Sequence, residues 1–178
     1  MKRFLLGFIG SFLILSGAVG AQPRVDLMEG TLFFEGNLTF KYNLDDFSSP
    51  THKFGLGSTI GAGYFVVDNL AVGASVPAVW DFSKEGKGNL GLKLFLTYFF
   101  DMGGVVFPYF GVNVVPKLLW PKTSFGLSAG VDTGFLISMS ESVALDLGIA
   151  PTINFAVSKD QKWSLEVPAG FVGVRAFF

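Results

Sequence analysis

The side chains of this chain that could carry out chemistry are few and widely spaced. The sequence of 178 residues has no cysteine and one histidine. The absence of cysteine excludes a disulfide framework, a thiolate metal site and a cysteine nucleophile. A lone histidine gives little support to a metal site. No phosphate-binding glycine loop, dinucleotide fingerprint or metalloprotease motif occurs either. We therefore predict no cofactor and no metal.

The histidine, His52, lies in a polar segment that also contains Asp45, Asp46, Ser48 and Ser49. These are the residue types of a Ser–His–acid catalytic set. Such a set works when hydroxyl, imidazole and carboxylate share hydrogen-bond geometry, which a polar loop rarely fixes. We interpret His52 as a solvated loop residue and predict that the chain is not an enzyme.

A second group of candidate residues consists of charges isolated among small and apolar residues. Each falls on the less apolar face of an alternating segment, and together they are Glu35, Lys93, Asp132, Asp146 and Arg175. Unpaired charges are costly inside a narrow interior of low dielectric, so we expect these side chains to pair. They would form a polar plug that ties strands together. The alternative role is a gate in a narrow pore.

The composition indicates that the chain folds in an apolar environment. Half of its residues are hydrophobic and only 15% are charged, whereas soluble domains carry about 25% charged residues. The formal net charge is −1, so no basic excess suggests a nucleic-acid partner.

Residues 1–21 have the organisation of a secretory signal peptide. Lys2 and Arg3 precede an apolar core, and Val19-Gly20-Ala21 forms a small-residue cleavage site. We divide the chain into this signal peptide, a short N-terminal segment at 22–28 and one domain at 29–178.

The domain consists of segments in which apolar residues alternate with small or polar ones. A period of two indicates β-strands. The eight segments lie at about 31–42, 54–66, 70–81, 90–100, 105–116, 124–135, 143–154 and 163–178. Short turns near 68–69, 101–104 and 138–142 alternate with longer polar loops at 43–53, 83–88, 117–123 and 156–162. An even number of strands joined in this way is typical of an antiparallel up-and-down transmembrane β-barrel.

Three features fit the pattern less simply. The alternation in the eighth segment breaks near Gly170-Phe171, where a β-bulge would restore it. The segment at 105–116 is apolar on both faces, so its facing stays open. Four prolines fall inside the segments, and we expect Pro77, Pro108, Pro151 and Pro168 to lie toward strand ends or at bulges, because each lacks a ladder donor.

The placement of aromatic residues favours a membrane barrel over a soluble one. Membrane barrels carry aromatic girdles at both bilayer interfaces. The outer girdle would contain Tyr42, Trp80, Trp120 and Trp163, joined by Phe54 and Phe82. The periplasmic girdle would contain Tyr64, Tyr98, Phe100 and Phe178, joined by Phe107. The less apolar face of the alternating segments is rich in Gly, Ala, Ser and Thr. Such a face suits the filled lumen of an eight-stranded barrel.

The leader, the eight alternating segments over 29–178 and the final aromatic residue resemble the small outer-membrane β-barrel proteins of the OmpA/OmpX type. Val172, Val174, Ala176 and Phe178 resemble the assembly signal of that family, with alanine where a second aromatic is common. The resemblance implies recognition by the barrel-assembly machinery. We expect a barrel of this type without a periplasmic domain of the OmpA kind.

These observations predict an integral protein of the outer membrane of a Gram-negative-type bacterium. We expect a monomer in contact with outer-membrane lipid and lipopolysaccharide, with a structural or surface-interaction role. A narrow, low-conductance pore is one alternative. An outer-membrane lipid-modifying enzyme is the other, although Phe82 separates Asp81 from Ser83, unlike the adjacent Asp-Ser of the acyltransferases.

Overall fold

The computed structural model describes residues 23–43, 53–81, 88–120, 124–155, 164–168 and 170–178. Within them the chain forms one antiparallel sheet. Its strands are β1 (Leu32–Asn43), β2 (Lys53–Val67), β3 (Leu70–Asp81), β4 (Gly88–Gly91), β5 (Lys93–Phe99), β6 (Val106–Trp120), β7 (Ser124–Ser138), β8 (Val143–Ile149), β9 (Thr152–Phe155), β10 (Ser164–Glu166) and β11 (Gly170–Phe177). No helix of the described residues is long and apolar enough to cross a membrane.

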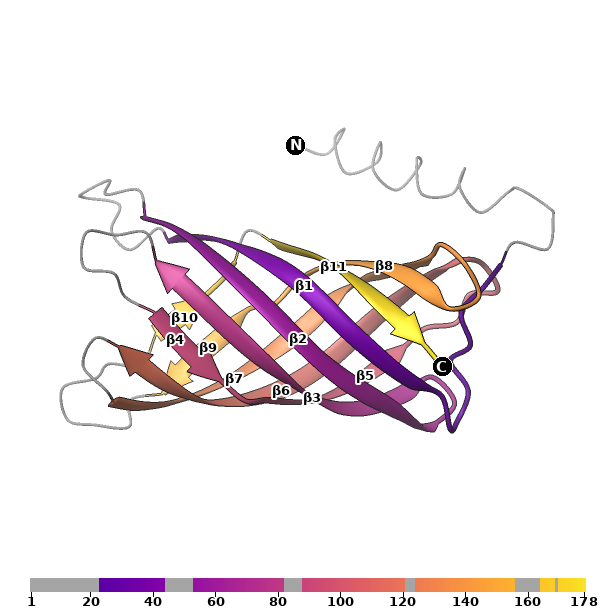
Figure 1. The fold of residues 1–178 in the computed structure, drawn as a ribbon, viewed down its shortest axis with the longest axis horizontal. Helices are drawn as coiled ribbons and strands as arrows, with labels where there is room; N and C mark the ends of the chain where they lie inside the picture. The colour runs from indigo at the N-terminus through magenta and orange to yellow at the C-terminus, as the bar shows by residue number, and fades with distance from the viewer. Residues whose placement is uncertain (1–22, 44–52, 82–87, 121–123, 156–163, 169) are drawn as a thin grey trace.

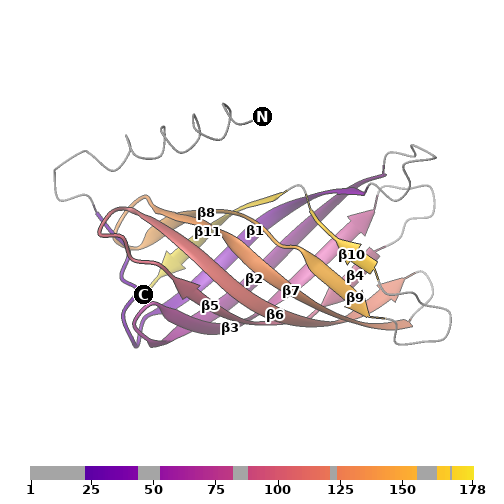
Figure 2. The same ribbon diagram turned by 180° about the vertical axis from the view of Figure 1, so that it is seen from behind.

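The sheet closes on itself into a barrel. The last strand, β11, pairs with β8 on one side and with β1 on the other, where Phe33 faces Phe177 and Phe40 faces Gly170. Figures 1 and 2 show the strands inclined around a common axis, with the C-terminus beside the start of β1. Closure leaves the first and last strands paired, so the predicted eight-stranded antiparallel barrel is confirmed.

Three of the eight strands are interrupted, and prolines account for two of the interruptions. Leu92 separates β4 from β5 because its partner Pro116 accepts its N–H at 3.0 Å but has no N–H to return. Pro151 separates β8 from β9 in the same way, accepting the Val131 N–H at 3.0 Å. The expectation that the prolines lie toward strand ends or at bulges holds for Pro151, which lies between the end of β8 at Ile149 and the start of β9 at Thr152. It was wrong for Pro77, which faces Thr59 inside β3. Pro77 and Pro151 each cost a single ladder bond and leave the register unchanged.

The third interruption, between β10 and β11, is the bulge predicted from the broken alternation. Glu166 faces Thr152 and Phe171 faces Gly148. From Glu166 to Phe171 the strand advances by five residues, whereas its neighbour advances by four from Thr152 to Gly148. One extra residue on one strand of a pair defines a β-bulge. Gly170 ends the bulge with a φ of +149°, a conformation that side-chain-bearing residues avoid.

Alternation places apolar side chains on the outside of the barrel. Phe34, Ile60 and Leu118 are each more than half exposed. On β6, whose facing the sequence left open, the odd-numbered residues point inward and the even-numbered residues point outward. Phe107 is fully buried inside the barrel, so its predicted place in the periplasmic girdle was wrong. A strand that is apolar on both faces carries no signal for its register.

We call the barrel end formed by the turns after β2, β5 and β7 the turn end, and the opposite end the loop end. An aromatic cluster fills the interior at the turn end. It contains Phe33, Phe65, Phe99, Phe107 and Phe177, with Leu136 and Ala144. The Phe33 ring occupies the place of a side chain at Gly63, where an added Cβ would lie 2.3 Å from it. Small residues on one strand thus leave room for rings on another.

The N-terminal segment, residues 23–31, covers the turn end. Its Val25 and Leu27 are buried against the aromatic cluster. The Val25 N–H donates to Ser138 Oγ at 3.0 Å, and the Leu27 carbonyl accepts the Asn69 N–H at 2.8 Å. Arg24 pairs with Asp101 and lies 4.9 Å from the centroid of the Phe107 ring. The segment therefore contacts all three turns.

The bulge geometry predicts that Gly170→Ala destabilises the barrel. A non-glycine residue in such a strained conformation costs about 1–3 kcal/mol. Gly36→Ala is the matched control, because Gly36 has ordinary strand geometry and open space around its missing Cβ. Urea unfolding of the refolded barrel, followed by gel mobility without boiling, compares the two. Equal midpoints would contradict the assigned strain.

The contact between Arg24 and Asp101 predicts a pH dependence at the turn end. A hydrogen bond from the Gly103 backbone N–H and the neighbouring Arg24 guanidinium hold the Asp101 pKa below its ordinary 3.8. The ionised carboxylate therefore stabilises segment docking above about pH 4, and this stabilisation is lost as the pH falls below 3.8.

Hydrogen exchange at the Asn69 amide, which Leu27 protects, measures this docking. After correction for intrinsic exchange, the wild type should lose protection at low pH more steeply than Asp101→Asn. The difference between the two proteins separates Asp101 from Asp26 and Asp68, which also bind amides of the segment. Identical pH profiles would show that Asp101 does not hold the segment.

Candidate functional site

The most buried charges of the barrel meet at Arg175 of β11. Ladder pairing places Arg175 directly opposite Glu35 of β1. Its Nε and Nη2 lie 2.8 Å and 2.7 Å from Asp146 Oδ2, whereas Nη2 lies 3.5 Å from Glu35 Oε2. Tyr109 completes the group by donating its hydroxyl to Asp146 Oδ1 at 2.8 Å. Asp146, rather than Glu35, is thus the principal partner of the guanidinium.

Arg175 also lies against the aromatic cluster. Its guanidinium carbon is 5.1 Å from the Phe33 ring centroid and 5.4 Å from those of Phe99 and Tyr109. Its Nη1 is buried and has no hydrogen-bond partner. Ring faces attract cations, most strongly where water is excluded. The guanidinium therefore joins the apolar half of the interior to the polar half.

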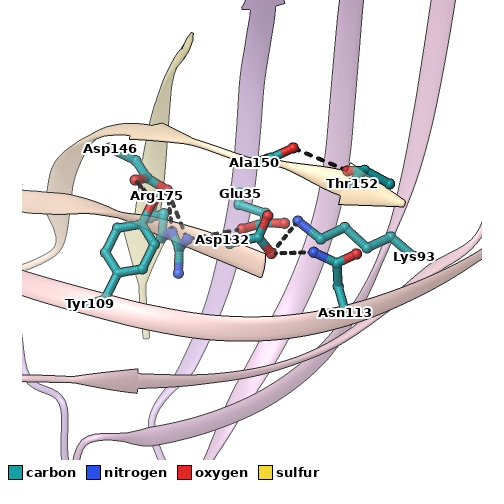
Figure 3. A network of polar contacts seen from close by, with 9 residues as sticks. All are labelled: Glu35, Lys93, Tyr109, Asn113, Asp132, Asp146, Ala150, Thr152 and Arg175. Atoms are coloured by element: carbon teal, nitrogen blue, oxygen red, sulfur yellow. Dashed lines mark hydrogen bonds and ion pairs between the residues drawn. The ribbon is translucent and has the colours of Figure 1, made fainter. Parts of the chain in front are cut away.

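A second ion pair lies closer to the loop end than the Arg175 group does. Lys93 Nζ contacts Asp132 Oδ2 at 2.7 Å, and Asn113 Nδ2 donates to the same oxygen at 2.9 Å. Figure 3 shows this pair beside the Arg175 group, with Glu35 and Asp132 drawn between Arg175 and Lys93. The five charges selected from the sequence thus form two neighbouring groups in one interior.

A third polar group lies farther toward the loop end. Asn154 accepts hydrogen bonds from Lys117 Nζ at 2.6 Å and from Ser128 Oγ at 3.0 Å. Its amide nitrogen donates to Ser164 Oγ at 3.2 Å and to Glu166 Oε2 at 3.4 Å. This amide therefore connects β6, β7 and β10 across the interior.

These polar groups line a cavity of about 130 Å³ between the aromatic cluster and the loop end. Its charged lining residues are Glu35, Lys93, Lys117, Asp132, Glu166 and Arg175. A water needs about 10–15 Å³ of such space, so the cavity is large enough for several water molecules.

Sequence reasoning missed three neutral members of this site. Tyr109 and Asn113 lie on the segment whose facing was left open, so nothing marked them as inward. Asn154 lies on the inward face of its segment, but an asparagine there reads as one more small polar residue. The available signal was that these residues alternate in step with inward positions, on the same face as the charged residues that form the ion pairs.

The girdle residues of the described chain lie on the outer face. Trp80 and Trp120 both face Gly88, on the strands either side of it, near the loop end. Tyr64, Tyr98, Phe100 and Phe178 are all more than 40% exposed at the turn end. Trp163, Phe82 and His52 lie outside the described residues, as do the segments 1–21 and 44–50. The side chains of Tyr42 and Phe54 are not described.

The described residues contain no group of three or more His, Asp or Glu side chains able to hold a metal ion. The described residues of the site are buried carboxylates, cations, amides and the Tyr109 hydroxyl. They interact with one another through ion pairs and hydrogen bonds.

Comparison with solved structures identifies the class of fold. No protein-family model matches the chain, and no curated protein matches it. Neisserial surface protein A shares 20% identity and a TM-score of 0.66, over 84% of this chain and 98% of that one. The N-terminal barrel of Pseudomonas aeruginosa OprF has 16% identity and a TM-score of 0.52, over 84% of this chain and 98% of that one. OprG of the same species has 12% identity and a TM-score of 0.54, over 87% of this chain and 98% of that one.

The chain therefore has the fold of the small eight-stranded outer-membrane β-barrels. The predicted resemblance is confirmed at the level of architecture. Identities of 20% and below establish a shared fold and do not transfer a role from these proteins to this one.

The two ion pairs predict unequal effects of removing their cations. Arg175→Met leaves Asp146 and Glu35 buried without their cation, and breaking such a pair costs about 3–5 kcal/mol. Lys93→Met should cost less, because the Lys93 side chain is 18% exposed against 6% for Arg175 and because the Asn113 amide still donates to Asp132 in this variant. Urea unfolding of the refolded variants measures both. Equal losses would contradict the central place of Arg175.

Proposed function

We propose that this chain is an integral outer-membrane protein whose interior is closed and whose role is structural or one of surface interaction. The observation that carries the proposal is the reversal of polarity across the barrel wall. Apolar side chains cover the outside, whereas charges and amides line the inside between the aromatic cluster and the loop end. This is the arrangement of a barrel whose solvent is lipid.

The orientation follows from the connections. Short turns are periplasmic and longer loops external in bacterial barrels, so the turn end would face the periplasm. The N-terminal segment would then lie on the side from which the chain is delivered. The strand of Val172, Val174, Ala176 and Phe178 closes the barrel against β1, and this supports the proposal that the assembly machinery reads it.

A closed interior is favoured over an open pore by the contents of the turn end. A path for ions would have to displace the rings of Phe33, Phe99 and Phe177 as well as the N-terminal segment that covers them. The narrow-pore alternative rests on the cavity above the cluster, which reaches only part of the interior. The enzyme alternative depends on His52, and the described residues add nothing in its favour.

The contacts proposed for the outside are with lipid and lipopolysaccharide. The external segments, including 43–53, would meet the cell's surroundings. The chain would act as a monomer, since the pairing of β11 with β1 closes the barrel and leaves, among the described strands between them, only the short β10 paired on a single side.

Expression in a Gram-negative host tests this proposal. The protein should fractionate with outer membranes, require detergent for extraction and migrate differently with and without boiling. In planar bilayers the refolded barrel should show no steady channels. Recovery in the soluble fraction would refute the membrane assignment, whereas steady channels in an otherwise membrane-bound protein would favour the pore.

A further inference from the structure

One wall of the interior cavity carries polar side chains that bind nothing else. They are Asn37 and Thr39 of β1, Thr59 of β2 and Asn89 of β4. Within the part of the chain that the structure describes, none of these four side chains takes part in a hydrogen bond. None of their polar atoms is among the buried atoms that lack a partner. Each is therefore accessible to a molecule in the cavity.

The other side of the cavity is already occupied by its own contacts. Lys93 and Asn113 both contact Asp132, and Ser128 donates to Asn154. The charged residues of the described lining are three acids and three bases, so the cavity has no formal net charge. An ion would find no excess of opposite charge there. The available hydrogen-bonding groups belong to neutral side chains.

The strand register gathers three of these neutral side chains around a glycine. Asn37 faces Thr59 across β1 and β2, and Thr39 faces Gly57. Gly57 in turn faces Val79 of β3. A Cβ added at Gly57 would lie 3.4 Å from the Thr39 Cβ and from a Val79 methyl carbon, which are ordinary contacts. The glycine therefore leaves an unfilled space, the Gly57 niche, with hydroxyl and amide groups on one side and an apolar side chain on the other.

We propose that the cavity binds a small neutral polyhydroxyl compound, a short polyol, in the Gly57 niche. Hydroxyl groups both donate and accept, so they pair with the Asn37 amide and with the Thr39 and Thr59 hydroxyls. The C–H groups of the compound lie against Val79. Because the aromatic cluster fills the turn end, the compound enters from the loop end. This binding site goes beyond the proposed structural role and requires no conduction.

The volume of the cavity sets the size of the ligand. A protein cavity of about 150 Å³ admits benzene, a molecule of about six non-hydrogen atoms. The cavity of about 130 Å³ therefore suits a ligand of the size of glycerol. Water fits as well, but its displacement from Pro77, Val79 and Val115 of the lining is favourable. A polyol replaces the hydrogen bonds of that water and covers the apolar groups.

Titration of glycerol into the refolded, ¹⁵N-labelled barrel in detergent micelles tests the proposal by NMR. The side-chain amides of Asn37 and Asn89 are the reporters, because both line the cavity. Their signals should shift and saturate with a dissociation constant of about 1–50 mM, since so small a ligand binds weakly. 1-Propanol has the same carbon chain with a single hydroxyl and should bind more weakly than glycerol.

Two variants test where the ligand binds. Thr59→Val removes one hydroxyl and should weaken glycerol binding about 2- to 10-fold, the net worth of one hydrogen bond. Gly57→Ala fills the niche with a methyl group at ordinary contact distance and should weaken binding at least as much. Gly36→Ala is the matched control, because it makes the same substitution in open space on the outer face of β1 and should leave the affinity unchanged.

The two variants fail independently, so if one does not refold, the other and the 1-propanol comparison still decide. The absence of a saturable shift would show that the cavity holds water only and would overturn the proposal. Equal binding of 1-propanol, or unchanged affinity in a folded Gly57→Ala or Thr59→Val barrel, would overturn it as well.

Discussion

The structure depends on the contact of Arg175 with Asp146 inside the barrel. Many of the large apolar residues of this barrel face outward, and the inward ones form a hydrophobic core only at the turn end. The interior must therefore be filled by side chains that satisfy one another. Arg175 does this in two directions. Its charge is matched by carboxylates of β8 and β1, and its face lies over three aromatic rings. Because it comes from the last complete strand, it also binds the seam at which the barrel closes.

The interior is graded from one end to the other. Aromatic rings and the N-terminal segment fill the turn end, two ion pairs follow, and amides and hydroxyls line the cavity toward the loop end. The gradient has a physical reason. Charges placed beside apolar rings need partners at short distance, whereas charges nearer the loop end can share amides and water.

Much of this architecture could be predicted from the sequence because a two-residue period is a strong signal. It indicated the number of strands, the facing of most of them and the bulge before Gly170. The segment 105–116 was the exception, since apolar residues on both faces leave its register open. For that reason the sequence did not predict the inward positions of Tyr109 and Asn113 or the burial of Phe107. The docking of residues 23–31 carries no periodic signal, because it depends on single contacts with three turns distant in sequence. Proline was also a weaker constraint than expected, since Pro77 and Pro151 each remove one bond without shifting a strand.

The central claim is that Arg175 and Asp146 act as one unit that holds β11 to β8. A double-mutant cycle with Arg175→Met and Asp146→Leu, read by unfolding of the refolded barrel, tests it most directly. The account predicts strong coupling, with the double variant less destabilised than the sum of the two single variants by about 1–3 kcal/mol. Additive losses would show that the two side chains contribute independently, and the interior would then not depend on their pairing.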